Sequence, residues 1–375
     1  MRLIIGLSIL SAVSSCATNR PVCDFENPIE SRCKPLKAGI IKINPEIDEV
    51  KPVAVAEDGG WAIASDVLVG PVNDQWVAGI SLKNGQTLWW LKTESGVASP
   101  ITMLGSWVIV GLRDGTVLKL ESLTGKVVWR TELSGFVTRP FVLSGSTLLA
   151  VSVKQELLAM DFQSGKTTWI YDPQQTSDLV IRGAAPPKVV GDTVYLGVAS
   201  GELHAVDLSN GRLSWKSNPA YSEFRFHDVM GEIYAENNRV VISRYDGVVT
   251  GLLVNGRTAN VSWKQELSSI TTSVVRNGVL YIGCVNGDVY GIEASTGRTL
   301  WKSKLSKQSV SFIFPTEKLL YVVGSNGRLG AMNSSKGTIV WHEDLDGKVT
   351  SPPFIFNKRI YFGTGLKTLY SFVIQ

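Results

Sequence analysis

The chain has 375 residues, of which 44% are hydrophobic and 19% are charged. A chain of this length and composition can bury a large core, in one domain or in two. Its 37 Lys and Arg residues are nearly balanced by 33 Asp and Glu residues, and no basic run is dense enough to follow a phosphate backbone. Nucleic acid is therefore not an expected partner.

The first residues, MRLIIGLSILSAVSSC, place one Arg before an apolar stretch that is shorter than the roughly 20 residues of a transmembrane helix. This arrangement is typical of an export signal. Small residues directly precede Cys16, as in a bacterial lipobox, in which the Cys thiol receives a diacylglycerol. We expect residues 1–15 to be a signal peptide and Cys16 to be lipidated. The alternative is a plain secretory signal with an incidental Cys16.

Residues 16–49 form a weakly patterned tail in which Cys23 and Cys33 lie ten positions apart. Because an exported chain enters an oxidising compartment, the sequence leaves two alternatives open, a Cys23–Cys33 disulfide or two free thiols. Neither alternative makes a metal site, because no histidine lies near the pair and the next cysteine, Cys284, is far away in the sequence.

After the tail, one motif recurs seven times: a polar turn closed by Gly and followed by Trp. A period of about 40 residues is typical of a repeat fold. The glycines recur at intervals of 40 to 46 residues and are Gly85, Gly125, Gly165, Gly211, Gly256, Gly297 and Gly337.

Each repeat combines an alternating strand such as residues 201–208, the Gly turn, a strand that carries the Trp, and two short apolar strands upstream. Four short antiparallel strands in each 40 residues predict a propeller blade. A Trp on the outer strand can fill the gap between adjacent blades. The tryptophans expected in this role are Trp89, Trp129, Trp169, Trp215, Trp263, Trp301 and Trp341.

An eighth inner hairpin, residues 359–375, ends the chain without an outer strand of its own. A ring without exposed edges needs an N-terminal segment to supply that strand, and residues 50–57 lie at a suitable distance before the first hairpin. The predicted fold is therefore all-β, an eight-bladed β-propeller of four-stranded antiparallel blades over residues 50–375, closed by an N-terminal strand. Seven blades and a capping hairpin are the alternative.

Two successive connections between repeats are longer than the others. Most repeats need 17 to 19 residues from the Trp to the next inner strand, whereas Trp169 to Val194 and Trp215 to Val240 each take 25. Because all such connections open on one face of a propeller, the two long ones are expected to be neighbours. The residues of interest in them are Leu179, Ile181 and Arg182 in the first and Phe224, Arg225, Phe226 and Asp228 in the second.

Apolar side chains beside an Arg on a long loop are typical of the anchors of protein interfaces. We therefore expect Leu179, Ile181 and Arg182 to bind a partner. In the alternative, Leu179 and Ile181 pack into their own blade, and Arg182 caps a carbonyl or pairs with Asp228.

Residues that could carry catalysis are scarce. The chain has only three histidines, and His204 and His342 are expected on the surface or rim of the fold. We find no nucleophile elbow, no adjacent cysteines of the kind that quinone dehydrogenases use and no cluster of metal-ligand type. The sequence thus predicts neither an enzyme nor a cofactor.

The Gly–Trp repeat resembles that of quinoprotein-type propellers, which include the pyrroloquinoline-quinone dehydrogenases and the BamB family of outer-membrane lipoproteins. The segment LVIRGAAP, residues 179–186, is similar to a Leu-x-Leu-Arg-Gly segment of the BamB family, with Leu179, Ile181, Arg182 and Gly183 on matching positions. Asp228 matches an acidic position of the family, which implies that it also binds the partner, whereas Met230 departs from a second acidic position.

This resemblance implies a non-catalytic scaffold that docks on the POTRA domains of BamA and so joins the Bam complex, with unfolded outer-membrane proteins as further partners. Ala17 after the lipidated Cys implies the periplasmic face of the outer membrane. Two alternatives from other classes are a quinone-dependent periplasmic dehydrogenase and a generic propeller that binds a ligand in its central channel. The quinone enzymes are considerably longer than this chain.

Overall fold

The computed structural model describes residues 37–42, 60–64, 66–73, 75–83, 86–174, 185–217, 226–349, 352–356, 359–364 and 368–373. Within these ranges every regular element is a β-strand. The first seventeen strands are β1 (Lys37–Lys42), β2 (Ala62–Ala64), β3 (Val67–Asn73), β4 (Trp76–Ser81), β5 (Thr87–Lys92), β6 (Thr102–Leu104), β7 (Trp107–Gly111), β8 (Thr116–Glu121), β9 (Val127–Glu132), β10 (Val142–Ser144), β11 (Thr147–Val151), β12 (Leu157–Asp161), β13 (Thr167–Tyr171), β14 (Lys188–Val190), β15 (Thr193–Gly197), β16 (Leu203–Asp207) and β17 (Leu213–Ser217). The others are β18 (Val229–Glu236), β19 (Arg239–Arg244), β20 (Val248–Asn255), β21 (Thr258–Glu266), β22 (Ile270–Arg276), β23 (Val279–Cys284), β24 (Asp288–Glu293), β25 (Thr299–Lys304), β26 (Val310–Pro315), β27 (Leu319–Gly324), β28 (Arg328–Asn333), β29 (Ile339–Asp344), β30 (Phe354–Phe356), β31 (Arg359–Thr364) and β32 (Thr368–Val373).

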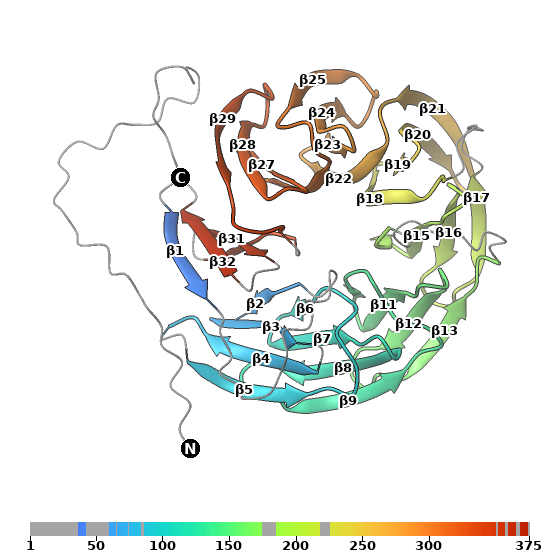
Figure 1. Cartoon of the computed structure of the whole chain (residues 1–375). Coiled ribbons are helices and arrows are strands. Elements are labelled where there is room, and N and C mark those ends of the chain that lie inside the picture. Colours follow the sequence, from blue (N-terminus) through green and yellow to red (C-terminus); the bar gives the residue numbers. More distant parts are fainter. Residues whose placement is uncertain are drawn as a thin grey trace.

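Strands β2 to β29 form seven sheets of four consecutive antiparallel strands, here numbered sheet 1 (β2–β5) to sheet 7 (β26–β29). Strands β30, β31 and β32 form a further four-stranded sheet with β1, here called the terminal sheet. The sheets follow one another around a ring, with the first strand of each sheet near the centre and the fourth at the rim (Figure 1). This arrangement is that of a β-propeller.

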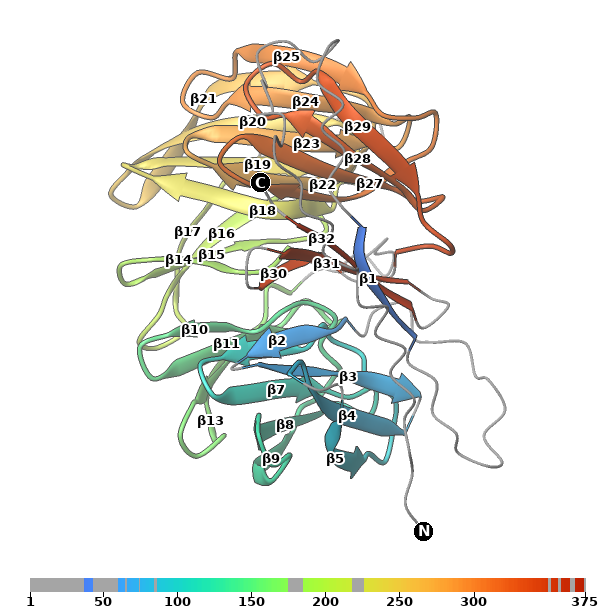
Figure 2. The ribbon, with the colours of Figure 1, turned by 90° about the vertical axis from the view of Figure 1, so that its left-hand side faces the viewer.

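The terminal sheet takes its fourth strand from the N-terminal side of the chain (Figure 2). Strand β1 pairs with β32, with Ile40 opposite Tyr370, and β31 pairs with the other edge of β32. Both edges of β32 are therefore occupied, and the expected pairing of residues 50–57 with this hairpin is wrong; those residues lie outside the described ranges.

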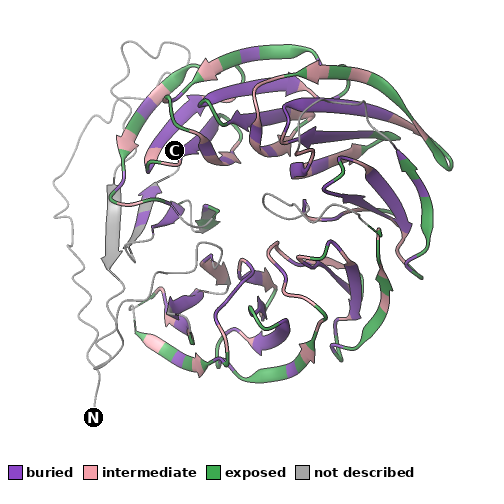
Figure 3. Ribbon diagram, turned by 45° about the vertical axis from the view of Figure 1, so that its right-hand side comes forward, coloured by how far each residue is buried: buried purple, intermediate pink, exposed green. Residues whose placement is uncertain are grey.

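Burial follows the position of a strand within its sheet (Figure 3). In sheet 2 the second and third strands, β7 and β8, are almost wholly buried, whereas β9 alternates between exposed and less exposed residues around buried Trp129. The hydrophobic core therefore lies between neighbouring sheets, and the rim faces solvent.

Four of the repeat tryptophans cross from one sheet to the next and donate their indole N–H to a backbone carbonyl there. Trp89 Nε1 lies 2.8 Å from the Ser122 oxygen, and Trp129 Nε1 lies 3.1 Å from the Phe162 oxygen. The other two such bonds, each 3.0 Å long, join Trp169 to Leu208 and Trp301 to Ser334. In each case the acceptor directly follows the third strand of the next sheet, so the bond ties two sheets together.

The other three tryptophans have different surroundings. The Trp263 ring lies against the Gly297 turn, while Trp215 packs on Tyr195 of its own sheet, with 6.0 Å between ring centroids. Trp341 packs on Phe372 of the terminal sheet, and its buried Nε1 has no hydrogen-bond partner among the described residues.

The turn glycine is required for two reasons, which Gly165 illustrates. Its φ of 72° lies in the left-handed region, and a Cβ atom added there would lie 2.6 Å from Cδ2 of Trp129. A side chain at this position would therefore strain the backbone and displace the tryptophan ring.

All connections between sheets leave on one face of the ring, here called the connection face, which also holds the turns between second and third strands. The Arg113 N–H bonds the Gly96 carbonyl at 2.8 Å, and the Tyr245 N–H bonds the Asp228 carbonyl at 2.9 Å, so connections pack on these turns. Residues 172–187 join sheets 3 and 4, and residues 218–228 join sheets 4 and 5.

The expected extra length is found only partly where the sequence predicted it. Residues 172–187 do exceed the equivalent connection of residues 133–141, but residues 218–228 exceed it only slightly. The remainder lies in β18, which has eight residues where β14 has three. The ladder of β18 is irregular between Met230 and Tyr234, so a bulge absorbs the additional residues.

A pair of glycine substitutions tests the tryptophan contact. Gly165→Ala should lower the free energy of unfolding by about 2–4 kcal/mol, because left-handed strain and overpacking against Trp129 add together. Gly145 also has a positive φ, 58°, but an added Cβ would meet no atom within 4 Å, so Gly145→Ala should cost only about 1 kcal/mol. Urea unfolding of both variants measures the difference, and equal losses would show that the ring contact is unimportant.

Candidate functional site

The structure describes only some of the predicted site residues. Leu179, Ile181 and Arg182 lie in residues 175–184, outside the described ranges, as do Cys16, Cys23 and Cys33. Of the second connection, residues 226–228 are described. The connection face is thus known from the described ends of both connections and from the side chains that hold them.

The Asp228 side chain is buried, whereas an acid that binds a partner directly is expected to be exposed. The residue is only 1% exposed, and its carbonyl accepts the bond from Tyr245 described above. The reason is local, since β18 begins at Val229, which is itself buried, and draws Asp228 into the joint between sheets 4 and 5.

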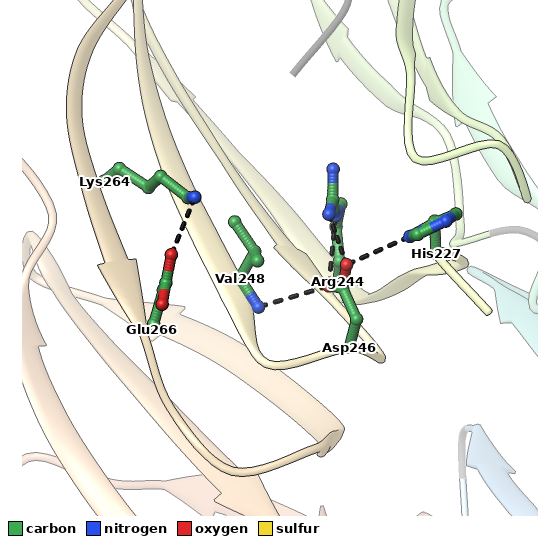
Figure 4. Close-up of polar contacts among 6 residues, drawn as sticks. All are labelled: His227, Arg244, Asp246, Val248, Lys264 and Glu266. Carbon is green, nitrogen blue, oxygen red and sulfur yellow. Dashed lines mark hydrogen bonds and ion pairs between the residues drawn. The ribbon is translucent and has the colours of Figure 1, made fainter. Parts of the chain in front are cut away.

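A buried ion pair joins Arg244 to Asp246 in sheet 5 (Figure 4). Arg244 Nε lies 3.1 Å from Asp246 Oδ1, and a second guanidinium nitrogen bonds Asp246 Oδ2. His227 Nδ1 lies 3.0 Å from Asp246 Oδ2, and the Val248 N–H bonds Asp246 Oδ1 at 3.2 Å. We call His227, Arg244 and Asp246 the Asp246 cluster.

The charges of the Asp246 cluster are well compensated. The Arg244 and Asp246 side chains are 2% and 0% exposed. Burial by itself would raise the pKa of Asp246, but hydrogen bonds from Arg244 and His227 outweigh it and lower the pKa below its usual value. Lys264 and Glu266 form a 2.8 Å pair on the outer strand of the same sheet, where solvent leaves it with little energetic weight (Figure 4).

A second polar cluster lies at the joint of sheets 3 and 4. Tyr171 Oη lies 2.8 Å from His204 Nδ1, and His204 Nε2 lies 3.3 Å from Glu202 Oε2. Lys216 Nζ lies 3.2 Å from Glu202 Oε1. We call these four residues the His204 cluster. The expectation that His204 lies on the surface or rim is wrong, because the residue is 1% exposed and lies against the Tyr171 ring of the preceding sheet.

Burial shifts the pKa values of both partners of the shortest bond in the His204 cluster. It raises the pKa of Tyr171 to about 12, with the negative charges of Glu202 and Asp172 adding to the effect. Burial also lowers the pKa of His204, although Glu202 acts in the opposite direction. The hydroxyl and the neutral imidazole are therefore the favoured forms.

One turn contacts both clusters. Residues 198–202 join β15 to β16, and Glu202 belongs to the His204 cluster. A Cβ atom added to Gly201 would lie 3.0 Å from Arg244 Cδ and 3.1 Å from the His227 carbonyl oxygen, so this turn packs closely on the Asp246 cluster. Hydrogen bonds thereby join sheets 3 and 4, and close packing joins sheet 4 to sheet 5, where residues 172–187 and 218–228 leave the ring. Sequence reasoning missed these clusters, although two of the three histidines belong to them.

The structure offers little for catalysis or metal binding in the part of the chain that it describes. No group of three or more His, Cys, Asp or Glu side chains there could hold a metal ion, and no helix there could cross a membrane. Burial raises the pKa of the Cys284 thiol to about 12, which leaves it protonated and unreactive. His342 is exposed on the outer strand β29.

A cavity of about 550 Å³ opens toward the centre of the ring, between the inner strands β10, β14 and β18. Its walls combine apolar side chains such as Leu143 and Val189 with the polar side chains of Ser144, Lys188 and Glu232. Lys188 Nζ and Glu232 Oε1 lie 3.5 Å apart, and the other Glu232 oxygen accepts a bond from the Val275 N–H. The two charged side chains of this cavity thus already bond other groups of the protein.

Comparison with known proteins finds a matching family model and related chains. A family model described as outer membrane protein assembly factor BamB matches residues 73–303 and 285–374. The chain is 27% identical over 285 residues to the outer membrane protein assembly factor BamB of Yersinia pestis, which covers 72% of this chain and 70% of the relative.

Two solved structures share the fold. BamB from Moraxella catarrhalis superposes with a TM-score of 0.75 at 20% identity, covering 91% of this chain and all of that one. A europium-containing methanol dehydrogenase superposes with a TM-score of 0.69 at 12% identity, covering 84% of this chain and 91% of that one. The fold alone does not separate the two functions. The family model matches almost the whole propeller, and the chain belongs to the BamB family of outer membrane protein assembly factors.

Proposed function

We propose that the chain is a non-catalytic scaffold of the outer-membrane protein assembly complex, which aids folding and insertion of β-barrel proteins. The observation that carries the proposal is the family match over residues 73–374. The relatives are named as assembly factors. A rigid ring with long connections on one face supports such a role, because binding residues concentrate on loops held by a rigid scaffold.

The ring itself is proposed to have eight blades, closed by the N-terminal strand. The terminal sheet has the same four-stranded antiparallel form as sheets 1 to 7, and β1 occupies the position of the outer strand. Closure of this kind leaves no sheet edge open between the two ends of the chain. The propeller domain would then begin at β1 rather than at residue 50.

The proposed partner is BamA, bound through its POTRA domains, with the rest of the Bam complex reached through BamA. Leu179, Ile181 and Arg182 are the proposed anchors, because apolar residues around an Arg fit the centre of an interface. The described ends of their connection leave the ring beside the His204 cluster. Asp228 is proposed to act from within the joint and to support this surface without direct contact.

The enzyme alternative has less support. The methanol dehydrogenase likeness is one of fold at 12% identity, and the adjacent cysteines typical of the quinone enzymes are absent from the sequence. The generic ligand-binding alternative would use the cavity near the centre of the ring. Its lysine and glutamate already pair with each other, so neither of these charged side chains is held ready there for a ligand.

The proposed location is the periplasmic face of the outer membrane, with a lipid on Cys16. The relatives' role in outer-membrane assembly supports this location. Several acyl chains on one residue give stable anchoring where a single chain does not. The strand β1 begins 21 residues after Cys16, which allows a tether of up to about 70 Å.

An interface variant tests the docking proposal. Arg182→Glu should weaken binding to purified POTRA-domain protein by roughly thirtyfold or more, because it removes an anchor and adds a repelled charge. The matched control is Arg212→Glu, an exposed Arg in the β16–β17 turn on the opposite face, which should bind normally. Thermal unfolding of both variants should match the wild type. Unchanged binding by Arg182→Glu would refute the interface.

The anchor is tested by Cys16→Ala in the full chain. The variant should remain unprocessed or be released from the membrane fraction as a soluble protein, because the acceptor thiol is gone. Fractionation of cell membranes followed by immunoblotting gives the readout. A variant that is processed normally and still sediments wholly with the membranes would contradict the lipid anchor.

A further inference from the structure

The His204 cluster has the geometry of a device that positions the connection face. Tyr171 is the last residue of β13, immediately before residues 172–187 leave sheet 3. Its hydroxyl is bonded to His204 in the third strand of sheet 4, so one hydrogen bond fixes where this connection departs relative to the next sheet. Glu202, on the other side of the imidazole, belongs to the turn that packs on the Asp246 cluster.

The bonds assign the protonation state of the imidazole. The Tyr171 hydroxyl donates to Nδ1, and Nε2–H donates to the Glu202 carboxylate, so the neutral tautomer protonated at Nε2 satisfies both partners. A proton on Nδ1 would place a donor opposite the Tyr171 donor. The hydroxyl would then have to accept from Nδ1–H, so the bond would reverse its direction and the hydroxyl proton would need another acceptor in the joint.

We propose that His204 is a positioning residue for partner binding, which holds the connection face in its binding arrangement only while the imidazole is neutral. The proposal rests on the docking function proposed above. Protonation of His204 in acid should therefore lower the affinity for the partner, although His204 need not contact the partner itself.

The charged groups around His204 set the direction of its titration. Burial disfavours the imidazolium, and so does Lys216, which is 55% exposed, whereas the Glu202 carboxylate favours it; Asp172 lies on the Tyr171 side. The net result is a lowered pKa for His204 in the folded protein.

The sign of the pH effect follows from that direction. The unfolded chain takes up the proton at about pH 6.5, before the folded chain does. The contribution of neutral His204 to the free energy of unfolding is therefore complete above about pH 6.5. This contribution declines as the pH falls from there toward the lower pKa of the folded state.

The first experiment measures binding of the purified chain to POTRA-domain protein between pH 7.5 and 5.0. The wild type should lose affinity as the pH falls, by up to about tenfold for each pH unit below the folded pKa. His204→Gln keeps an amide that can bond Glu202 but cannot titrate, so its affinity should depend far less on pH. His342→Gln removes the exposed histidine of β29 and should keep the wild-type profile.

The hydroxyl is tested separately. Tyr171→Phe should weaken binding at pH 7.5 about fivefold to tenfold, because the loss of one hydrogen bond frees the joint. The matched control is Tyr321→Phe in sheet 7, since that buried hydroxyl has no hydrogen-bond partner among the described residues. Wild-type binding by Tyr171→Phe, or an unchanged pH profile in His204→Gln, would overturn the proposal.

A measurement that needs no partner protein tests the His204 cluster separately from docking. In the NMR spectrum of the wild type, the His204 imidazole should titrate below about pH 6.5, the value of an unperturbed histidine, and Tyr171→Phe should move this titration. If the wild type binds no POTRA-domain protein at any pH, the docking function fails while this titration still tests the cluster. A His204 signal that titrates at or above about pH 6.5 and ignores Tyr171→Phe would refute the positioning role.

Discussion

At four joints between neighbouring sheets, the indole hydrogen bond is the contact on which the ring depends. Trp129 illustrates this contact. Its side chain is 8% exposed, fills the gap between sheets 2 and 3, and donates its indole N–H to the Phe162 carbonyl. The turn glycine must be Gly because the same ring lies where its Cβ would be. Repetition of this contact gives a rigid circular frame, and the frame holds every connection of one face in a defined place.

The connection face differs from the rest of the frame because polar contacts reinforce it over three sheets. The His204 cluster joins sheets 3 and 4, the Asp246 cluster holds the entry to sheet 5, and the turn of residues 198–202 contacts both. Such buried polar groups are costly unless every partner is present, and removal of one partner leaves the others unpaired. The places where the two long connections leave the ring are therefore set by side chains that lie beneath the surface.

The sequence predicted the sheets well, because the spacing of Gly and Trp is a local and periodic signal. It failed where a contact joins distant parts of the chain. The pairing of β1 with β32 depends on both ends of the chain, and the expected segment at residues 50–57 had only its distance in its favour. The sequence placed His204 at the surface or rim, because its hydrogen-bond partner Tyr171 belongs to another sheet. No local pattern in the sequence indicates that bond. Asp228 matched a family position, yet burial removes its carboxylate from the surface.

The central claim is that this face, and not the opposite one, meets the assembly machinery. Photo-crosslinking in cells tests it most directly, with the crosslinking amino acid placed at exposed Gln174 on the connection face or at exposed Asn210 in the β16–β17 turn on the other face. We expect a crosslink to BamA from position 174 and none from position 210. Equal crosslinking from both positions, or a BamA product from position 210 alone, would contradict it.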